Sequence, residues 1–175
     1  MRLSLMRLSS VHLSSVRVSC ACAIACVASH AAGAQTLSER NLSTALAVEA
    51  AEAALDRCSS QNHKVSVAVV DRTGRTRVLL RGDDARPHTM DSSQRKAYTA
   101  FTFRNSTNAL AEGLAHNPGN APLFTLPDLL PLAGGVPIRA GNEVIGGIGV
   151  GGAPAGTIDE ACASAGVEKI KDRLQ

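Results

Sequence analysis

The sequence predicts a mixed α/β domain in which helices pack on an antiparallel sheet. Apolar residues recur at helical spacing from Leu42 onward, and short strand-like runs follow in both halves of the chain. The turns at Asp71–Gly74 and Gly141–Asn142 have hairpin length, and strands joined by hairpins run antiparallel. Because the predicted helices have apolar faces to bury, we expect them to lie on the sheet.

Residues 1–34 have the composition of a cleavable secretory signal, so we expect a periplasmic or secreted protein. Arginines supply positive charge, no acidic residue precedes Glu39, and an apolar run follows at 18–28. This run is too short to span a bilayer as a retained anchor. It ends in the small residues Ala32–Ala34, which place the cleavage before Gln35.

An alternative for this leader is a lipoprotein. Ala23–Cys26 loosely matches a lipoprotein cleavage box, which would leave the mature chain anchored at Cys26. The chain has 18 Lys and Arg against 15 Asp and Glu, and three of these arginines lie in the leader. The remainder therefore has a net charge near zero and lacks the clustered basic residues of a nucleic-acid-binding protein. We expect no nucleic-acid partner and no stable membrane insertion after signal cleavage.

Residues 35–175 suit one domain, and Cys58 and Cys162 are the cysteines outside the leader. In an oxidising compartment, two cysteines suggest one disulfide. It would close a loop of about 100 residues, worth roughly 4–5 kcal/mol in the chain-entropy estimate. Two separate buried thiols are the alternative, and two cysteines are too few for a zinc site of sulfur ligands.

Local signals place the elements of the N-terminal half. Capping-box spacing at Thr36 and Glu39 predicts a helix that ends near residues 58–61. Strands are expected at 65–70 and 76–81. Helices are expected from Asp91 and over 107–115.

The C-terminal half is predicted to return to strand. An extended segment at 129–132 leads to Val136–Ile138, which contains a proline and should be an edge or a bulge. The last strand is expected at Glu143–Val150. A second capping box at Thr157 and Glu160 predicts a terminal helix that runs to about Arg173.

One face of the last strand is almost without side chains. Alternation places Ile145 with Gly147, Gly149 and Gly151 on this face, and Ile148 on the other. Glycine weakens a strand and usually allows something to approach closely. A flat ligand or oxyanion could lie there, or a closely packed helix or subunit. The G-x-G-x-x-G match argues little for a dinucleotide, because its glycines lie inside the strand.

Polar side chains concentrate between Arg81 and Lys96, where a loop meets a predicted helix start. Such a place favours anions, so the segment is a candidate rim of a binding site; a solvated loop with ordinary ion pairs is the alternative. His88 lies among these groups and is the favoured ligand. His63 precedes a strand and is expected at the surface, whereas His116 ends a helix, where its charge suits the dipole. No histidine lies in a zinc motif, and no G-x-S-x-G is present.

Ordered stretches of the chain resemble the GlcG/HbpS family of haem-binding-like proteins, which includes the C-terminal domain of PduO-type proteins. They are Val67–Gly74, Arg81–Ala85, Arg95–Ala100, and Gly134–Ile138 with Val144–Gly152. The likeness spans residues 36–175. It implies a profilin-like three-layer α/β/α fold with a five-stranded antiparallel sheet, and it implies a homo-oligomer.

The resemblance also implies a small-ligand site, with haem as the specific cofactor and a redox or haem-sensing role. The threonine after Lys-Ala-aromatic, here Thr99, is implied in the haem site, and His88 and Thr99 are the candidate iron ligands. Asp84 departs from the pattern, because glycine is expected there; Asp tolerates positive φ better than most residues. The candidate ligand-binding positions are Arg81, Asp83, His88, Lys96, Thr99, Gly134, Gly135, Gly147 and Gly149.

Two other functions stay open at the level of sequence. In an enzyme acting on a small carboxylate or carbonyl compound, Arg81 would bind the anion and Lys96 or His88 would move protons. An accessory module of a membrane sensor would instead use its surface to bind a partner. We expect ligand binding rather than catalysis.

Overall fold

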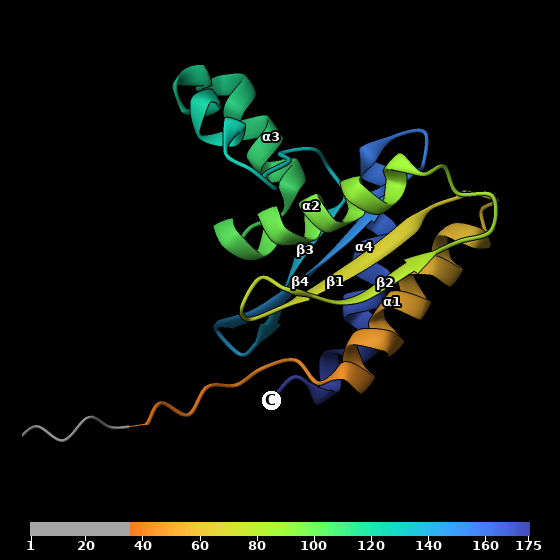
Figure 1. Cartoon of the computed structure of the whole chain (residues 1–175), viewed down its shortest axis with the longest axis vertical. Helices are drawn as coiled ribbons and strands as arrows, with labels where there is room; N and C mark the ends of the chain where they lie inside the picture. The colour runs from red at the N-terminus through yellow and green to blue at the C-terminus, as the bar shows by residue number, and fades with distance from the viewer. Residues whose placement is uncertain (1–35) are drawn as a thin grey trace, which may run out of the picture. The chain divides into compact units, whose positions relative to one another are not determined.

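The computed structural model describes residues 36–175. The leader, its cleavage site before Gln35 and the alternative anchor at Cys26 lie outside the described residues. The elements, in chain order, are α1 (Thr44–Ser59), β1 (Ser66–Asp71), β2 (Thr76–Arg81), α2 (His88–Phe103), α3 (Thr107–His116), the 3-10 helix η1 (Pro118–Thr125), β3 (Gly135–Ala140), β4 (Glu143–Gly151), α4 (Gly156–Ile170) and the 3-10 helix η2 (Lys171–Arg173) (Figure 1). Among the helices of residues 36–175, none has the length and apolarity to cross a membrane.

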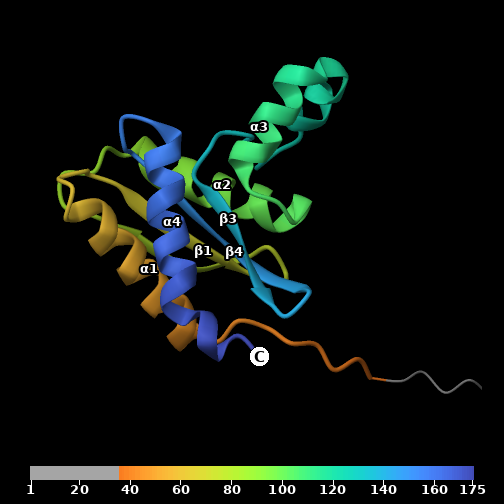
Figure 2. The same cartoon turned by 180° about the vertical axis from the view of Figure 1, so that it is seen from behind.

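The strands form an antiparallel sheet in the order β2-β1-β4-β3. Helix α2 covers one face, and α1 and α4 cover the other (Figures 1 and 2). This confirms the three-layer α/β/α architecture. Both faces of β1 are buried, which suits the small and apolar residues of this strand. Strand β3 lies at an edge, where the missing N–H of Pro137 is tolerated.

The sheet has four strands rather than five, because residues 129–132 form no strand. Pro131 has no N–H to donate to a ladder. Side chains of α2 bind the neighbouring backbone groups instead. Arg95 donates to the carbonyl of Leu129 at 2.8 Å, and the N–H of Leu130 donates to Thr99 Oγ1 at 2.8 Å.

The predicted helix start at Thr36 is wrong. Residues 36–43 are not helical, and α1 begins at Thr44 with Ser43 as its N-cap. Ser43 Oγ accepts from the N–H of Leu46 at 3.3 Å. The carboxylate of Glu39 is used elsewhere, since it pairs with Arg72 at 3.2 Å.

The starts of the other two long helices also differ from prediction. Helix α2 begins at His88, directly after Pro87, rather than at Asp91. Helix α4 begins at Gly156 without a side-chain cap. The predicted capping glutamate, Glu160, accepts instead from the N–H groups of Asn108 at 3.2 Å and Gly134 at 3.3 Å.

The bare face of β4 lies directly against α2. A Cβ atom on Gly147 would collide with the carbonyl oxygen of Ala97, and one on Gly149 would collide with the backbone of Ser93 and Ala97. A closely packed helix therefore occupies this face. The expectation that Gly147 and Gly149 contact a ligand does not match this packing, because α2 covers both glycines.

The other face of the sheet carries the main hydrophobic core. Val67, Ile148 and Val150 point from the central strands toward α1 and α4. Ile145 belongs to this core too, although simple alternation assigned it to the glycine face. The β3–β4 register shifts after Ile138, and such a bulge reverses the alternation beyond it.

A disulfide joins α1 to α4 and confirms the predicted pairing. Cys58 and Cys162 are bonded, with their Cα atoms 5.6 Å apart, and both side chains are fully buried. The alanine-rich face of α1 permits this close helix pair. Gly166 of α4 sits against Ala50 and Ala54, where any side chain would collide with the α1 backbone.

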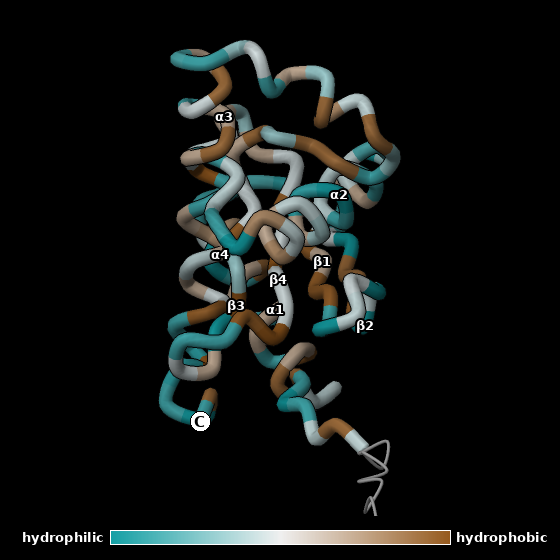
Figure 3. Tube along the Cα trace, turned by 90° about the vertical axis from the view of Figure 1, so that its left-hand side faces the viewer, coloured by the Kyte–Doolittle hydropathy of each residue, from teal (hydrophilic) through white to brown (hydrophobic). Residues whose placement is uncertain are grey.

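Helix α3 and η1 form a small helical excursion after α2 (Figure 1). Phe103 and Phe124 hold it together, with ring centroids 5.1 Å apart. Leu123 and Leu126 remain exposed, and hydrophobic residues are visible along this segment in Figure 3.

We predict that Gly149→Ala will lower the free energy of unfolding by about 1–3 kcal/mol or more, because the new methyl group pushes α2 off the sheet. Gly113→Ala in α3 is the matched control, since its Cβ would meet nothing within 4 Å. That change should stabilise the protein by up to about 1 kcal/mol through helix propensity. Urea unfolding of both variants measures the difference, and equal effects would contradict this packing.

Candidate ligand-binding site

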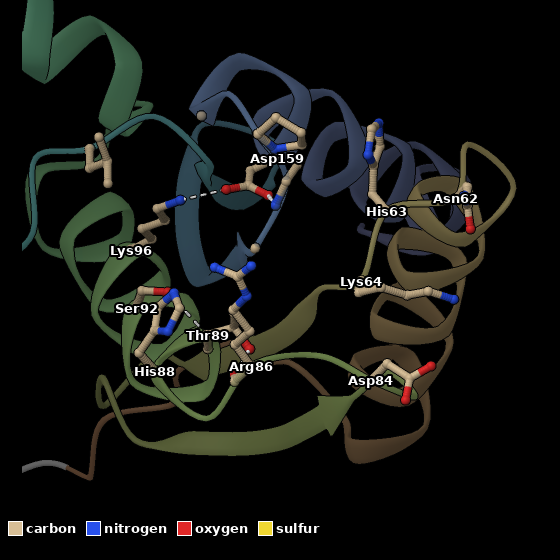
Figure 4. A pocket seen from close by; sticks show the side chains of 15 residues that line it. Asn62, His63, Lys64, Asp84, Arg86, His88, Thr89, Ser92, Lys96 and Asp159 are labelled. Atoms are coloured by element: carbon tan, nitrogen blue, oxygen red, sulfur yellow. Dashed lines mark hydrogen bonds and ion pairs between the residues drawn. The ribbon is translucent and has the colours of Figure 1, made fainter.

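A cavity of about 760 Å³ opens at the end of the sheet where β1 and α2 begin and where β4 leads into α4 (Figure 4). Its volume falls within the range of small-molecule sites. Leu132, Ala153 and Pro154 supply apolar surface. The polar lining consists of Asn62, His63, Lys64, Asp84, Arg86, His88, Thr89, Ser92, Lys96 and Asp159.

A buried ion pair forms the floor of this cavity. Lys96 of α2 and Asp159 of α4 are each 2% exposed, and Lys96 Nζ donates to Asp159 Oδ2 at 2.7 Å. Lys96 also donates to the carbonyl of Val150 at 3.0 Å, and Asp159 Oδ1 accepts from the N–H of Ala153 at 3.0 Å. Burial raises the pKa of Asp159, while the Lys96 ammonium and the Ala153 N–H oppose that rise.

The Gly134–Gly135 turn makes room for Lys96. Gly134 has φ +127, and a Cβ there would approach Lys96 Nζ and Asp159 Cβ at 2.8 Å. A Cβ on Gly135 would collide with the carbonyl of Lys96. The N–H of Gly135 donates to Thr107 Oγ1 at 2.8 Å. Both glycines therefore position the ion pair rather than line the cavity.

The loop between β2 and α2 forms one wall. Arg81 Nε donates to the carbonyl of Ala85 at 2.8 Å, which folds the loop back on itself. Asp84 adopts φ +62, the conformation for which a glycine was expected, and it lines the cavity. Arg81 and Asp83 do not reach the cavity, so Arg81 acts on the loop that carries Arg86 and His88.

Thr99 lies away from the cavity in this structure. Its side chain is fully buried, and its hydroxyl donates to the carbonyl of Arg95 at 2.7 Å and accepts from the N–H of Leu130. It thereby holds the segment that leads to Leu132, which does line the cavity. The structure does not bring Thr99 and His88 together around one point.

Several residues of the site could not be found by sequence reasoning. Asn62, Lys64 and the turn at 153–156 carry no motif, and His63 was expected only at the surface. Asp159 looks like an ordinary acidic residue in the first turn of a helix. Its role depends on Lys96, which lies 63 residues earlier in the chain. The segment from Asp84 to Lys96 gave a signal, as a cluster of polar residues, and the family resemblance also pointed to Lys96.

We predict that Asp159→Asn will destabilise the protein by about 3–5 kcal/mol, because the Lys96 ammonium loses its counter-charge in a buried site. Combining it with Lys96→Met should recover much of that loss, since both charges are then gone. Glu49→Gln, which breaks the more exposed pair with Arg173, should cost less than about 1 kcal/mol. Thermal and urea unfolding of the three variants tests this, and a double variant no better than Asp159→Asn would contradict it.

Known proteins resemble this chain over most of the described residues. The family model described as haem-degrading protein HbpS-like matches residues 42–168. Protein GlcG of Escherichia coli strain K12 is 36% identical over 109 residues, which make up 62% of this chain and 80% of GlcG. An uncharacterised 15.0 kDa protein of Citrobacter freundii is 32% identical over 124 residues, covering 68% of this chain and 83% of that protein.

Solved structures agree with this relationship. A crystal structure of a double mutant of Streptomyces reticuli HbpS is 44% identical, with a TM-score of 0.72, and the match covers 76% of this chain and 89% of that chain. The crystal structure of a PduOC–haem complex has a TM-score of 0.67 at 24% identity, covers 74% of this chain and 94% of that chain, and shows the shared fold. With its fold, its ordered motifs and the family match in agreement, this chain belongs to the HbpS-like family.

Proposed function

We propose that this protein is exported and binds haem in the cavity at the start of β1 and α2, with a haem-sensing or redox role. The observation that carries the proposal is the combination of imidazoles and cations in the lining of that cavity. The bound haem would supply an iron that changes between the ferrous and ferric states. The chain would supply an imidazole to hold the iron, positive side chains to bind the propionates, and the cavity that surrounds the ring.

The histidines of the cavity suit an iron porphyrin better than a bare metal ion. No three His, Cys, Asp or Glu side chains within residues 36–175 group as a metal site, whereas haem iron can be held by a single axial histidine. His88 and His63 both line the cavity, from different walls (Figure 4). We assign His88 as the iron ligand, because it stands at the start of α2 with an exposed imidazole.

The positive groups at the rim suit the two propionates of haem. Lys64 and Arg86 line the cavity, and neither forms an ion pair with any described residue. A guanidinium or ammonium bound to a carboxylate makes a strong, charge-assisted hydrogen bond. Helices α2 and α4 begin at this cavity without side-chain caps, so their positive ends add to the attraction.

The apolar lining supports a homo-oligomer as part of the proposal. Leu132, Ala153 and Pro154 offer limited apolar surface, and Leu132 is 50% exposed. A second protomer that packs over the cavity mouth would cover more of an apolar macrocycle. The Cys58–Cys162 disulfide supports the exported location, because such bonds persist in oxidising compartments.

An enzyme acting on a small carboxylate or carbonyl compound has less support. Lys96 was a candidate to move protons, but its ammonium is held by Asp159 and the Val150 carbonyl. Arg81 was the candidate anion ligand, but it binds the carbonyl of Ala85 outside the cavity. Of the three residues assigned to this chemistry, only His88 remains available in the cavity, so the geometry favours binding.

Titration of the purified protein with haem, followed by Soret absorption, tests the proposal. Wild type should give a saturable Soret band. We expect His88→Ala to shift or abolish it, because the imidazole that would hold the iron is lost. Arg86→Ala should keep the band position but weaken binding by roughly tenfold or more, the value of one charge-assisted hydrogen bond.

His116→Ala is the matched control, because His116 lies in α3 and its imidazole is bonded to the Glu112 carbonyl. It should bind haem as wild type does. If His63→Ala abolishes the band and His88→Ala does not, haem binds in this cavity but His63, and not His88, is the iron ligand. If neither His88→Ala nor His63→Ala differs from wild type, haem does not bind in this cavity.

A further inference from the structure

A second concave region lies at the opposite end of the sheet, where β1 and α2 end. Two adjoining cavities of about 380 and 480 Å³ share Arg72, Arg104 and Val144 in their linings. The β1–β2 turn, the last turns of α2 and the β3–β4 hairpin enclose them. We refer to the two together as the hairpin groove; it shares no lining residue with the cavity assigned to haem.

The hairpin groove has a mixed lining, in which an aromatic and apolar patch lies among polar side chains. Tyr98 and Phe101 reach it from α2, and Val144 reaches it from β4. The Tyr98 ring lies against Gly74, where a Cβ would approach Tyr98 Cε2 at 2.8 Å, so the β1–β2 turn holds the ring in place. The Tyr98 hydroxyl has no hydrogen-bond partner among residues 36–175. Both aromatic residues are half-buried, which leaves ring surface for a ligand.

Most of the charge at the rim is already neutralised. Glu143 binds Arg72 and also accepts from Arg40 at 3.1 Å, and Arg72 pairs with Glu39 as well. Hydrogen bonding from Arg72 lowers the pKa of Glu143, which keeps this carboxylate ionised and both arginines engaged at neutral pH.

Arg104 is the exception at this rim. Its guanidinium makes no ion pair within the described part of the chain, while its backbone is well fixed. It ends α2 with φ 54, and its carbonyl accepts from Arg139. A guanidinium without an ion-pair partner, on an anchored backbone, therefore lines the same cavity as the rings of Tyr98 and Phe101.

We propose that the hairpin groove binds an aromatic carboxylate, with the ring on Tyr98 and Phe101 and the carboxylate on Arg104. Ring faces favour a flat apolar group by stacking, and the guanidinium fork matches a carboxylate through two parallel hydrogen bonds. Inorganic phosphate would leave the two rings uncovered. A neutral aromatic compound would leave Arg104 unpaired.

The chain contains a built-in reporter for this site, because Tyr98 is its only tyrosine and it has no tryptophan. Naphthoate is a suitable probe, followed by calorimetry and by the ring resonances of Tyr98. We expect saturable binding that shifts those resonances. Arg104→Asn should weaken it by roughly tenfold or more, and asparagine tolerates the left-handed backbone at this position. Naphthalene methanol, which lacks the charge, should bind wild type as weakly as naphthoate binds Arg104→Asn.

Arg57→Asn is the matched control, since it removes an exposed arginine at the end of α1, outside the groove. It should bind naphthoate as wild type does. Arg86→Ala should also leave naphthoate binding unchanged, which separates this site from the haem cavity. The proposal is overturned if naphthoate does not saturate, if Arg104→Asn binds like wild type while remaining folded by circular dichroism, or if the Tyr98 resonances do not move.

Discussion

The contact between the side-chain-free backbone of β4 and the backbone of α2 fixes the position of every functional group that α2 carries. Gly147 and Gly149 of β4 have no side chains, so α2 approaches the sheet more closely than any larger residue would allow. This contact holds α2 along the sheet, from His88 at one end to Arg104 at the other. The two concave regions lie at those two ends. The stability lost by placing glycine in a strand is thus balanced by a fixed helix position.

The Lys96–Asp159 pair connects this helix to the opposite layer of the domain. Helix α2 covers one face of the sheet and α4 the other, and the pair joins them at the sheet's end, beneath the Gly134 turn. Buried ion pairs often add little net stability compared with apolar residues. Here the pair sets the geometry of a cavity floor, because each partner makes a further hydrogen bond to backbone. The cavity that we propose for haem therefore depends on both layers at once.

Local signals predicted most of the fold and little of the site. The β1–β2 and β3–β4 hairpins and the edge position of Pro137 follow from patterns within or near each segment. The Cys58–Cys162 pairing was instead predicted from the number of cysteines outside the expected leader. The prediction of a fifth strand was wrong because side chains of Arg95 and Thr99 form hydrogen bonds to the backbone at 129–130. The two predicted capping boxes do not form, because Glu39 and Glu160 bind groups that are distant in the sequence. The role of Asp159 could not be predicted either, because its partner Lys96 is far away in the sequence. The place of His88 in the site could be predicted, because its polar neighbours are close in sequence.

We propose above that the chain binds haem in the cavity where β1, α2 and α4 begin. The most direct test is an amide proton–nitrogen correlation spectrum of the labelled protein as zinc protoporphyrin, a diamagnetic haem analogue, is added. If haem binds there, the shifted amides should cluster at residues 62–64, 84–96 and 152–159, while α3 and η1 remain unchanged. Shifts confined to residues 107–125 or to the hairpin groove, with the cavity amides unmoved, would contradict it.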